Sequence, residues 1–207
     1  LKKLAEMNGG KYRTHGFYPY SIMRNVESDP TEYLYCACMF DYSPENAQFL
    51  KDHGIEYLLL GQHFVGNELE GWGSIGPTAD QAHYTLYCDQ TIEAMQTGLF
   101  TYFAHPDLVN FVGDEKFYRA ESRRLCRAAR ECGMPLEVNL LGIREGRHYP
   151  NPIFWECAAE ENCPVILGID AHQPHNFQHA TSETAAMQMI HRLGLQLLET
   201  TQLRFLK

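Results

Sequence analysis

The stretch EAMQTGLFTYFAHPDL, residues 93–108, contains the pattern that decides the fold. A helical pattern covers residues 78–97 and ends at Gly98, because glycine readily adopts the left-handed conformation that closes a helix. The β-rich run FTYFA, residues 100–104, then follows and ends in His105, Pro106 and Asp107. A helix, a short strand and a polar strand end therefore follow one another, which is typical of α/β proteins.

The same order repeats along the chain, and it indicates an α/β fold with mostly parallel strands. Residues 141–152 (LGIREGRHYPNP) are predicted to form a loop. No linker, internal repeat or charge block divides the sequence, so residues 1–207 are predicted to form a single domain. The predicted strands cover residues 33–40, 55–60, 100–104, 136–140 and 164–169, and the predicted helices cover residues 44–53, 78–97, 116–132, 153–162 and 183–193.

Composition excludes several classes of protein. Hydrophobic residues make up 44% of the 207 residues, which is enough for one sizeable core. The net charge of −9 disfavours a basic surface for nucleic acid. The sequence has no apolar run that approaches the roughly 18 residues of a membrane span, and no signal-peptide pattern. With seven cysteines and no CxxC pair, we expect a cytoplasmic protein with reduced, mostly buried thiols.

Polar side chains that bind metals follow several predicted strands. Four such residues each come after a predicted strand: His63, His105, Asp170 and His172. In barrels and open sheets the carboxyl ends of parallel strands lie at the same edge, so these side chains are expected to lie close together. Imidazole and carboxylate groups are ligands of zinc, manganese and iron. A lone histidine is more often structural, and we expect that of the other histidines in helices or polar loops, which are His53, His83, His148, His175, His179 and His191.

Four motifs occur in order: GQHF at residues 61–64, AHPDL at 104–108, EVN at 137–139 and GIDAHQP at 168–174. With these motifs the chain resembles the polymerase and histidinol phosphatase (PHP) superfamily, and within it the histidinol-phosphatase branch, from about Lys3 onward. The resemblance implies a distorted (β/α) TIM-like barrel of the PHP type, with a multinuclear metal site at its C-terminal rim. Similar members hydrolyse L-histidinol phosphate to L-histidinol and phosphate, a step of histidine biosynthesis.

The resemblance also implies roles for individual residues. His63 and His105 match two ligands of one metal, Asp170 matches a ligand of a second metal, and His172 matches a ligand of a third. His105 and Asp170 are accordingly the expected catalytic residues. His15 is the candidate for a further histidine ligand, although no Asp or Glu stands beside it as in the family motif.

Two residues near these motifs have alternative interpretations. Arg144 matches a family arginine that binds phosphate, and its planar guanidinium group suits bidentate binding of two phosphate oxygens. It is equally explained as a surface residue in a charged loop with Glu145 and Arg147. Asp107 either orients His105 as a carboxylate behind the metal ligand or caps the turn that follows.

The chain departs from the family pattern at two places. The family's first strand ends in H-x-H, which occurs nowhere in this sequence, so we expect that strand to lie upstream of Leu1. Met39 stands where the family has a glutamate that bridges two metals, and a thioether is a poor ligand for such cations.

The expected chemistry follows from divalent cations, namely zinc, manganese or iron, with magnesium as a further option. Clustered cations lower the pKa of a bound water, and the resulting hydroxide attacks phosphorus in line. The expected partner is a small phosphorylated substrate, and the sequence gives no oligomeric state. Two alternatives remain: a PHP phosphoesterase for another phosphorylated metabolite, or a degenerate, metal-poor domain without turnover, which Met39 and the missing H-x-H favour.

Overall fold

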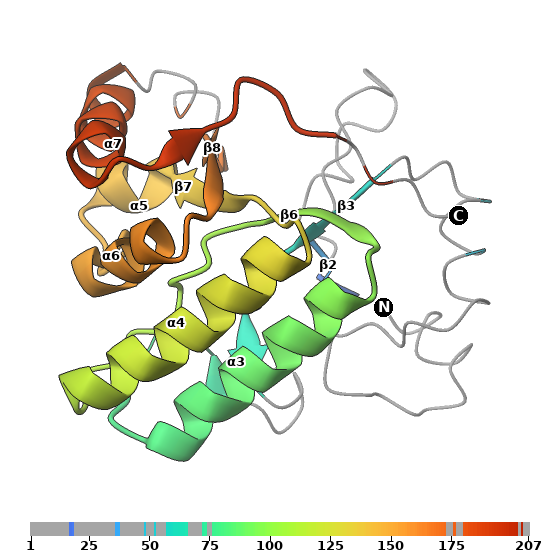
Figure 1. The fold of residues 1–207 in the computed structure, drawn as a ribbon, viewed down its shortest axis with the longest axis vertical. Helices are drawn as coiled ribbons and strands as arrows, with labels where there is room; N and C mark the ends of the chain where they lie inside the picture. The colour runs from blue at the N-terminus through green and yellow to red at the C-terminus, as the bar shows by residue number, and fades with distance from the viewer. Residues whose placement is uncertain are drawn as a thin grey trace.

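The computed structural model describes residues 17–18, 36–37, 48, 52, 57–65, 72–73, 76–172, 176, 180–202 and 204 (Figure 1). Within them, one sheet has the strand order β1-β2-β3-β6-β7-β8-β9. All neighbours from β2 to β9 are parallel, and β1 is antiparallel to β2. The strands are β1 (Phe17–Tyr18), β2 (Cys36–Ala37), β3 (Leu58–Leu60), β6 (Phe100–Phe103), β7 (Leu136–Asn139), β8 (Pro164–Gly168) and β9 (Gln196–Leu197). The predicted α/β class with mostly parallel strands is confirmed.

A separate two-stranded ribbon pairs β4 (Phe64–Val65) with β5 (Trp72–Gly73). Neither this ribbon nor β9 is predicted from the sequence. The first and last strands of the large sheet are not paired with each other in the part of the chain that the structure describes. The parallel sheet is therefore established, whereas the barrel type stays a prediction.

The helices are α3 (Gln81–Gln96), α4 (Glu115–Glu131), α5 (Leu140–Glu145), α6 (Pro152–Glu160) and α7 (Ala180–Leu193). Side chains cap the first turns of α3 to α6, because a capping carboxylate or amide oxygen accepts backbone N–H groups that lack helical partners. Asp80 caps α3, Asp114 caps α4 and Asn151 caps α6. The prediction of a loop over residues 141–152 is wrong for its first part, because Asn139 caps the short helix α5.

Helices α3 and α4 lie side by side, and α6 packs against α4 (Figure 1). The core between the helices and the sheet contains Leu60, Phe103 and Val138 from the strands and Tyr87 from α3. Trp155 of α6 is fully buried in the same core. Among the described helices, none combines the length and the apolarity needed to cross a bilayer.

Five cysteines of the described part of the chain are free thiols: Cys88, Cys126, Cys132, Cys157 and Cys163. Four of them, Cys88, Cys126, Cys157 and Cys163, are buried, as the composition predicts. Burial raises the pKa of Cys157 to about 11, so that thiol stays protonated near neutral pH.

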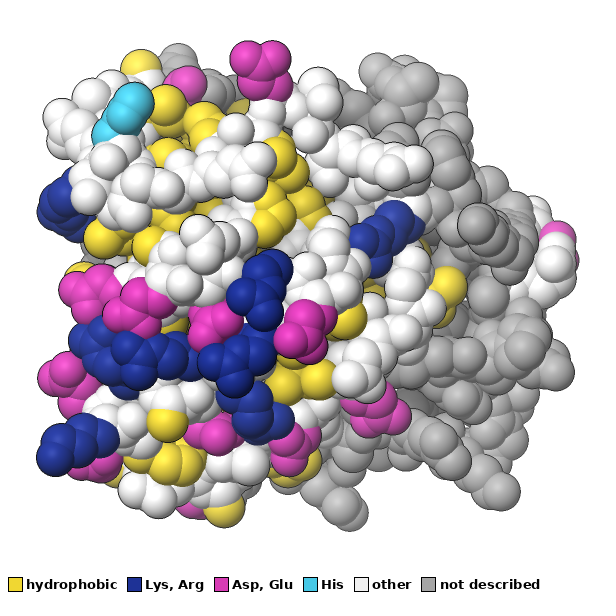
Figure 2. Space-filling model, viewed as in Figure 1, with side chains coloured by type: hydrophobic (Ala, Val, Ile, Leu, Met, Phe, Trp, Pro, Cys, Tyr) yellow, Lys and Arg dark blue, Asp and Glu magenta, His cyan; other side chains and the backbone are white. Residues whose placement is uncertain are grey.

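The exposed side of α4 carries a row of arginines that meet glutamates of α6 and of the turn after it. Figure 2 shows these basic and acidic side chains interleaved on one face of the molecule. We call this set the α4–α6 ion-pair row; its pairs are Arg119–Glu156, Arg123–Glu160, Arg127–Glu161 and Arg130–Glu161.

Candidate functional site

Polar side chains gather where neighbouring strands of the parallel sheet end. His63 follows β3, His105 follows β6, Asn139 ends β7, and Asp170 follows β8. Since β3, β6, β7 and β8 are consecutive in the sheet, their carboxyl ends lie along one edge. Hydrogen bonds, ring contacts and electrostatic interactions connect six residues there, which we call the strand-end cluster: His63, His105, Glu137, Asn139, Asp170 and His172.

The imidazole rings of His63 and His105 are in direct contact. Their centroids are 4.8 Å apart, and the rings meet edge to face at 82°. His105 is 4% exposed, and its Nδ1 atom is buried without a hydrogen-bond partner in the described structure. Burial lowers the pKa of His63 to about 3 and that of His105 to about 4. Both rings are therefore neutral near pH 7, which is the form that binds metals.

Asp170 and His172 are also placed together. Nδ1 of His172 lies 3.5 Å from Oδ1 of Asp170 and 3.1 Å from the Asp170 carbonyl oxygen. The backbone N–H of His172 donates to the side-chain oxygen of Asn176 at 2.8 Å. The charges of Asp170 and His172 both act on the pKa of His63, the former raising it and the latter lowering it. The structure thus brings together the four strand-end residues that the sequence singles out.

Glu137 and Asn139 are part of the cluster although the sequence analysis assigns them no role. Oε2 of Glu137 accepts the backbone N–H of His105 at 2.8 Å and the Asn139 amide at 2.9 Å. The same amide donates to Oδ2 of Asp170 at 3.1 Å. Burial, and next to it the charge of Asp170, raise the pKa of Glu137 to about 7.

The pattern LEVN of β7 contains the signal for these two residues. All four of its residues are buried, and side chains alternate between the faces of a strand. Leu136 and Val138 belong to the hydrophobic core, so Glu137 and Asn139 share the opposite face. Two buried polar side chains on one face at a strand's carboxyl end indicate a site, even before their partners are known.

Two members of the cluster have left-handed backbones. His105 has φ +34° and Asp170 has φ +47°, which is uncommon for residues with a Cβ. Asn162, at the end of α6, is the third such residue in the described part of the chain. Strained backbones at two strand ends are typical of functional sites, where surrounding contacts hold the strain.

Arg144 of α5 points toward the same region. Its Nη1 donates to the Asn176 carbonyl oxygen at 3.4 Å, while Nε and Nη2 are buried without partners in the described structure. Asn176 also binds the backbone of His172, so the guanidinium and the cluster share a neighbour. This placement differs from the alternative of a surface residue in a charged loop, because Arg144 lies on helix α5 with two buried guanidinium nitrogens, while Glu145 pairs with Arg147 beside it. The positive charge of Arg147 in turn lowers the pKa of His105.

Asp107 has neither of the two roles expected from the sequence. Its Oδ2 accepts the backbone N–H of Asn151 at 2.5 Å and the indole N–H of Trp155 at 3.0 Å. It thereby ties the loop after β6 to the start of α6, while Nδ1 of His105 stays without a hydrogen bond. Burial raises the pKa of Asp107 to about 6.

His15 and Met39 lie outside the described residues. Within the residues that the structure describes, no group of three or more His, Cys, Asp or Glu side chains is placed to hold a metal ion. The cluster therefore contains paired donors, such as His63 with His105, rather than a complete coordination sphere.

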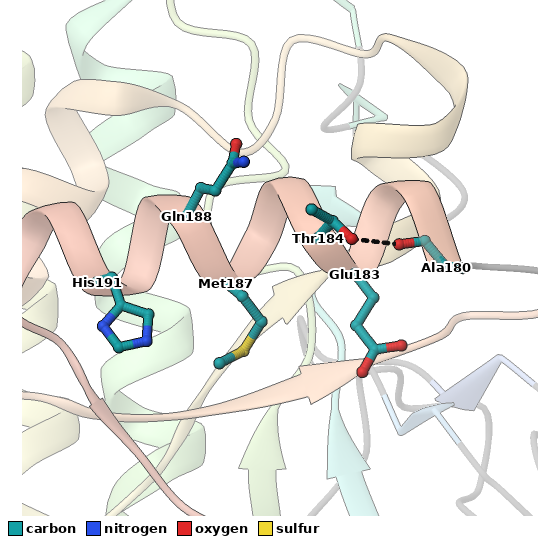
Figure 3. A pocket seen from close by; sticks show the side chains of 6 residues that line it. All are labelled: Ala180, Glu183, Thr184, Met187, Gln188 and His191. Carbon is teal, nitrogen blue, oxygen red and sulfur yellow. Dashed lines mark hydrogen bonds between the residues drawn. The ribbon is translucent and has the colours of Figure 1, made fainter.

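One hollow of about 600 Å³ lies elsewhere, over the side chains of α7 (Figure 3). Its lining includes Met187 and His191, and Thr184 in it donates to the Ala180 carbonyl oxygen at 2.8 Å. No member of the strand-end cluster lines this hollow, so we do not assign the site to it.

No protein-family model matches the chain. No curated protein matches its sequence either. The likeness to the PHP superfamily consequently rests on the four ordered motifs of this sequence.

Proposed function

We propose that this chain is a metal-dependent phosphomonoesterase that hydrolyses L-histidinol phosphate to L-histidinol and phosphate. The observation that carries the proposal is the strand-end cluster, in which two neutral imidazoles in contact lie beside a carboxylate and a third imidazole. A (β/α) barrel of the PHP type belongs to the same proposal, and the parallel sheet is compatible with part of such a barrel.

The donors of the cluster fit divalent cations by their chemistry. Imidazole nitrogens and carboxylate oxygens suit zinc, manganese and iron. Nδ1 of His105 is buried and has no hydrogen-bond partner among the described residues. We assign His63 and His105 to one cation, Asp170 to a second and His172 to a third, with His15 as a further ligand. Bound cations supply an acidic water and neutralise phosphoryl charge.

Arg144 is the proposed phosphate-binding residue. Its Nε and Nη2 atoms form one edge of the guanidinium, and both lack hydrogen-bond partners among the described residues, whereas Nη1 donates to Asn176. A guanidinium edge with two N–H groups binds two phosphate oxygens at once. The role of Arg144 is to orient the phosphoryl group so that water attacks opposite the leaving histidinol oxygen.

The substrate is tested with a panel of phosphorylated small molecules on metal-reconstituted protein. We expect kcat/KM for L-histidinol phosphate to exceed that for p-nitrophenyl phosphate by at least about tenfold, because binding of the substrate's imidazole adds to transition-state stabilisation. Equal values for the two compounds reject histidinol phosphate as the substrate, and a preferred member of the panel then identifies another phosphorylated metabolite.

A non-catalytic, metal-poor domain is the second candidate, and a specific observation favours it. The described residues hold no set of three donors around a common point. Metal analysis by mass spectrometry after reconstitution separates the two candidates. We expect at least one tightly bound equivalent for the enzyme, whereas less than one equivalent together with no turnover supports the non-catalytic domain.

A further inference from the structure

Asn139 uses every hydrogen-bonding atom of its amide in contacts that meet at the candidate site. Its Oδ1 accepts the backbone N–H of Gly142 at 3.0 Å and so caps α5, the helix that carries Arg144. Its Nδ2 donates one hydrogen to Glu137 at 2.9 Å and the other to Asp170 at 3.1 Å. One side chain, 2% exposed, therefore connects the ends of two strands, β7 and β8, with the start of a helix.

Glu137 continues this network to His105. Its Oε2 accepts the backbone N–H of His105 at 2.8 Å. His105 is one of the two cluster residues with a left-handed backbone. The carboxylate has a fixed position because it lies directly over Gly168 of β8, where a methyl group in place of the glycine hydrogen would overlap Oε1. Glu137 and Asn139 thus contact both strained strand-end residues, His105 through its backbone and Asp170 through its carboxylate.

We propose that Glu137 and Asn139 are positioning residues, which hold His105 and Asp170 in the orientation that a bound divalent cation requires. This inference rests on the proposed function and adds to it two residues that bind no cation themselves. The physical reason is that an amide with two hydrogens keeps the buried carboxyl group of Glu137 and the half-buried one of Asp170 at fixed distances, while a buried backbone hydrogen bond maintains the positive φ of His105. Groups behind metal ligands commonly set metal affinity in this way.

The experiment compares Asn139→Ser and Glu137→Gln with Asp107→Asn as a matched control. Serine still caps α5 through its hydroxyl oxygen but cannot donate to two carboxylates, and glutamine keeps the shape of Glu137 without its charge. Asp107 is the counterpart of Glu137, since each buried carboxylate accepts one backbone N–H and one side-chain N–H. Mn²⁺ binding is measured by calorimetry on the full chain, with kcat, KM and the Tm of each variant.

We expect Asn139→Ser and Glu137→Gln each to raise the Kd for Mn²⁺ by about 10- to 100-fold and to lower kcat more than they change KM. Asp107→Asn is expected to lower the Tm and to leave the Mn²⁺ affinity within about twofold, because its carboxylate serves the fold alone. Unchanged Mn²⁺ affinity in a folded Asn139→Ser or Glu137→Gln protein overturns the positioning role and leaves the phosphatase proposal intact. Absence of Mn²⁺ binding by the wild-type chain rejects both.

Discussion

Across α4 and α6, arginines meet glutamates at the surface, whereas at the carboxyl ends of β6, β7 and β8 imidazole, carboxylate and amide groups are buried together. In the α4–α6 ion-pair row, opposite charges neutralise each other in contact with water, as in the pair of Arg123 and Glu160. In the strand-end cluster, one amide lies between the carboxyl groups of Glu137 and Asp170, and burial together with the charge of Asp170 raises the pKa of Glu137. The cluster is thus arranged poorly for stability, as we expect of the proposed cation site.

The largest effect is expected for His105→Ala, which removes a buried member of the cluster. We expect at least about a 100-fold loss of hydrolysis and a lower metal content, with a modest change in Tm, since a ligand contributes to chemistry more than to packing. His83→Ala is the control, because His83 lies on α3 outside the cluster and should leave turnover intact. Normal activity in the His105→Ala protein would remove His105 from the site.

Features that depend on neighbouring residues in the chain can be predicted from the sequence, whereas contacts between distant residues cannot. The longer parallel strands and most helices follow from local patterns, because caps such as Asp80 and Asp114 and the apolar runs act over a few residues. The two-residue strands β4, β5 and β9 give no such pattern. His63 lies beside His105 because β3 and β6 are neighbours in the sheet, and the sequence predicts both histidines at the ends of such strands. The role of Asp107 cannot be predicted in this way, because it depends on Trp155, 48 residues further along the chain. The short helix α5 escaped prediction since one turn and a half gives little periodic signal.

Gly168→Ala tests whether the buried network is as rigid as its bonds imply. The added methyl group overlaps Oε1 of Glu137, and the carboxylate is held by His105 and Asn139, so it cannot move without breaking a hydrogen bond. We expect the free energy of unfolding to fall by about 1–3 kcal/mol in urea denaturation.

The control for that variant is Gly76→Ala, where no atom of the described residues beyond the chain neighbours lies within 4 Å of the added methyl group. Its free energy of unfolding should stay within about 0.5 kcal/mol of the wild-type value. If Gly168→Ala were as stable as Gly76→Ala, Glu137 would be free to move and the cluster would not be rigid.

The pH dependence of stability distinguishes the buried cluster from the surface row. The unfolded state protonates His105 near its ordinary pKa of 6.5, whereas burial keeps the folded residue neutral down to about 4. Between these values the unfolded state binds more protons, so this contribution to stability is present at neutral pH and is lost as the pH falls. We expect it to decrease by about 1–2 kcal/mol from about pH 7 to about pH 5 in metal-free protein.

His105→Asn isolates that contribution, because asparagine does not titrate. The difference in unfolding free energy between wild type and variant should shrink or reverse toward low pH. Glu137, whose pKa is raised, has the opposite effect on the pH dependence of stability, but this effect is present in both proteins and cancels in the difference. Parallel pH profiles for the two proteins would mean that His105 reaches solvent in the folded state.

The smallest effect is expected in the α4–α6 ion-pair row, where a double-mutant cycle on Arg123 and Glu160 measures one pair. Arg123 Nε donates to Glu160 Oε2 at 2.6 Å, and the two side chains are 41% and 45% exposed. Water screens such a pair and holding two long side chains costs entropy, so we expect a coupling of about 0.2–1 kcal/mol that declines as salt is added. A larger, salt-independent coupling would show that the row acts as a connected network.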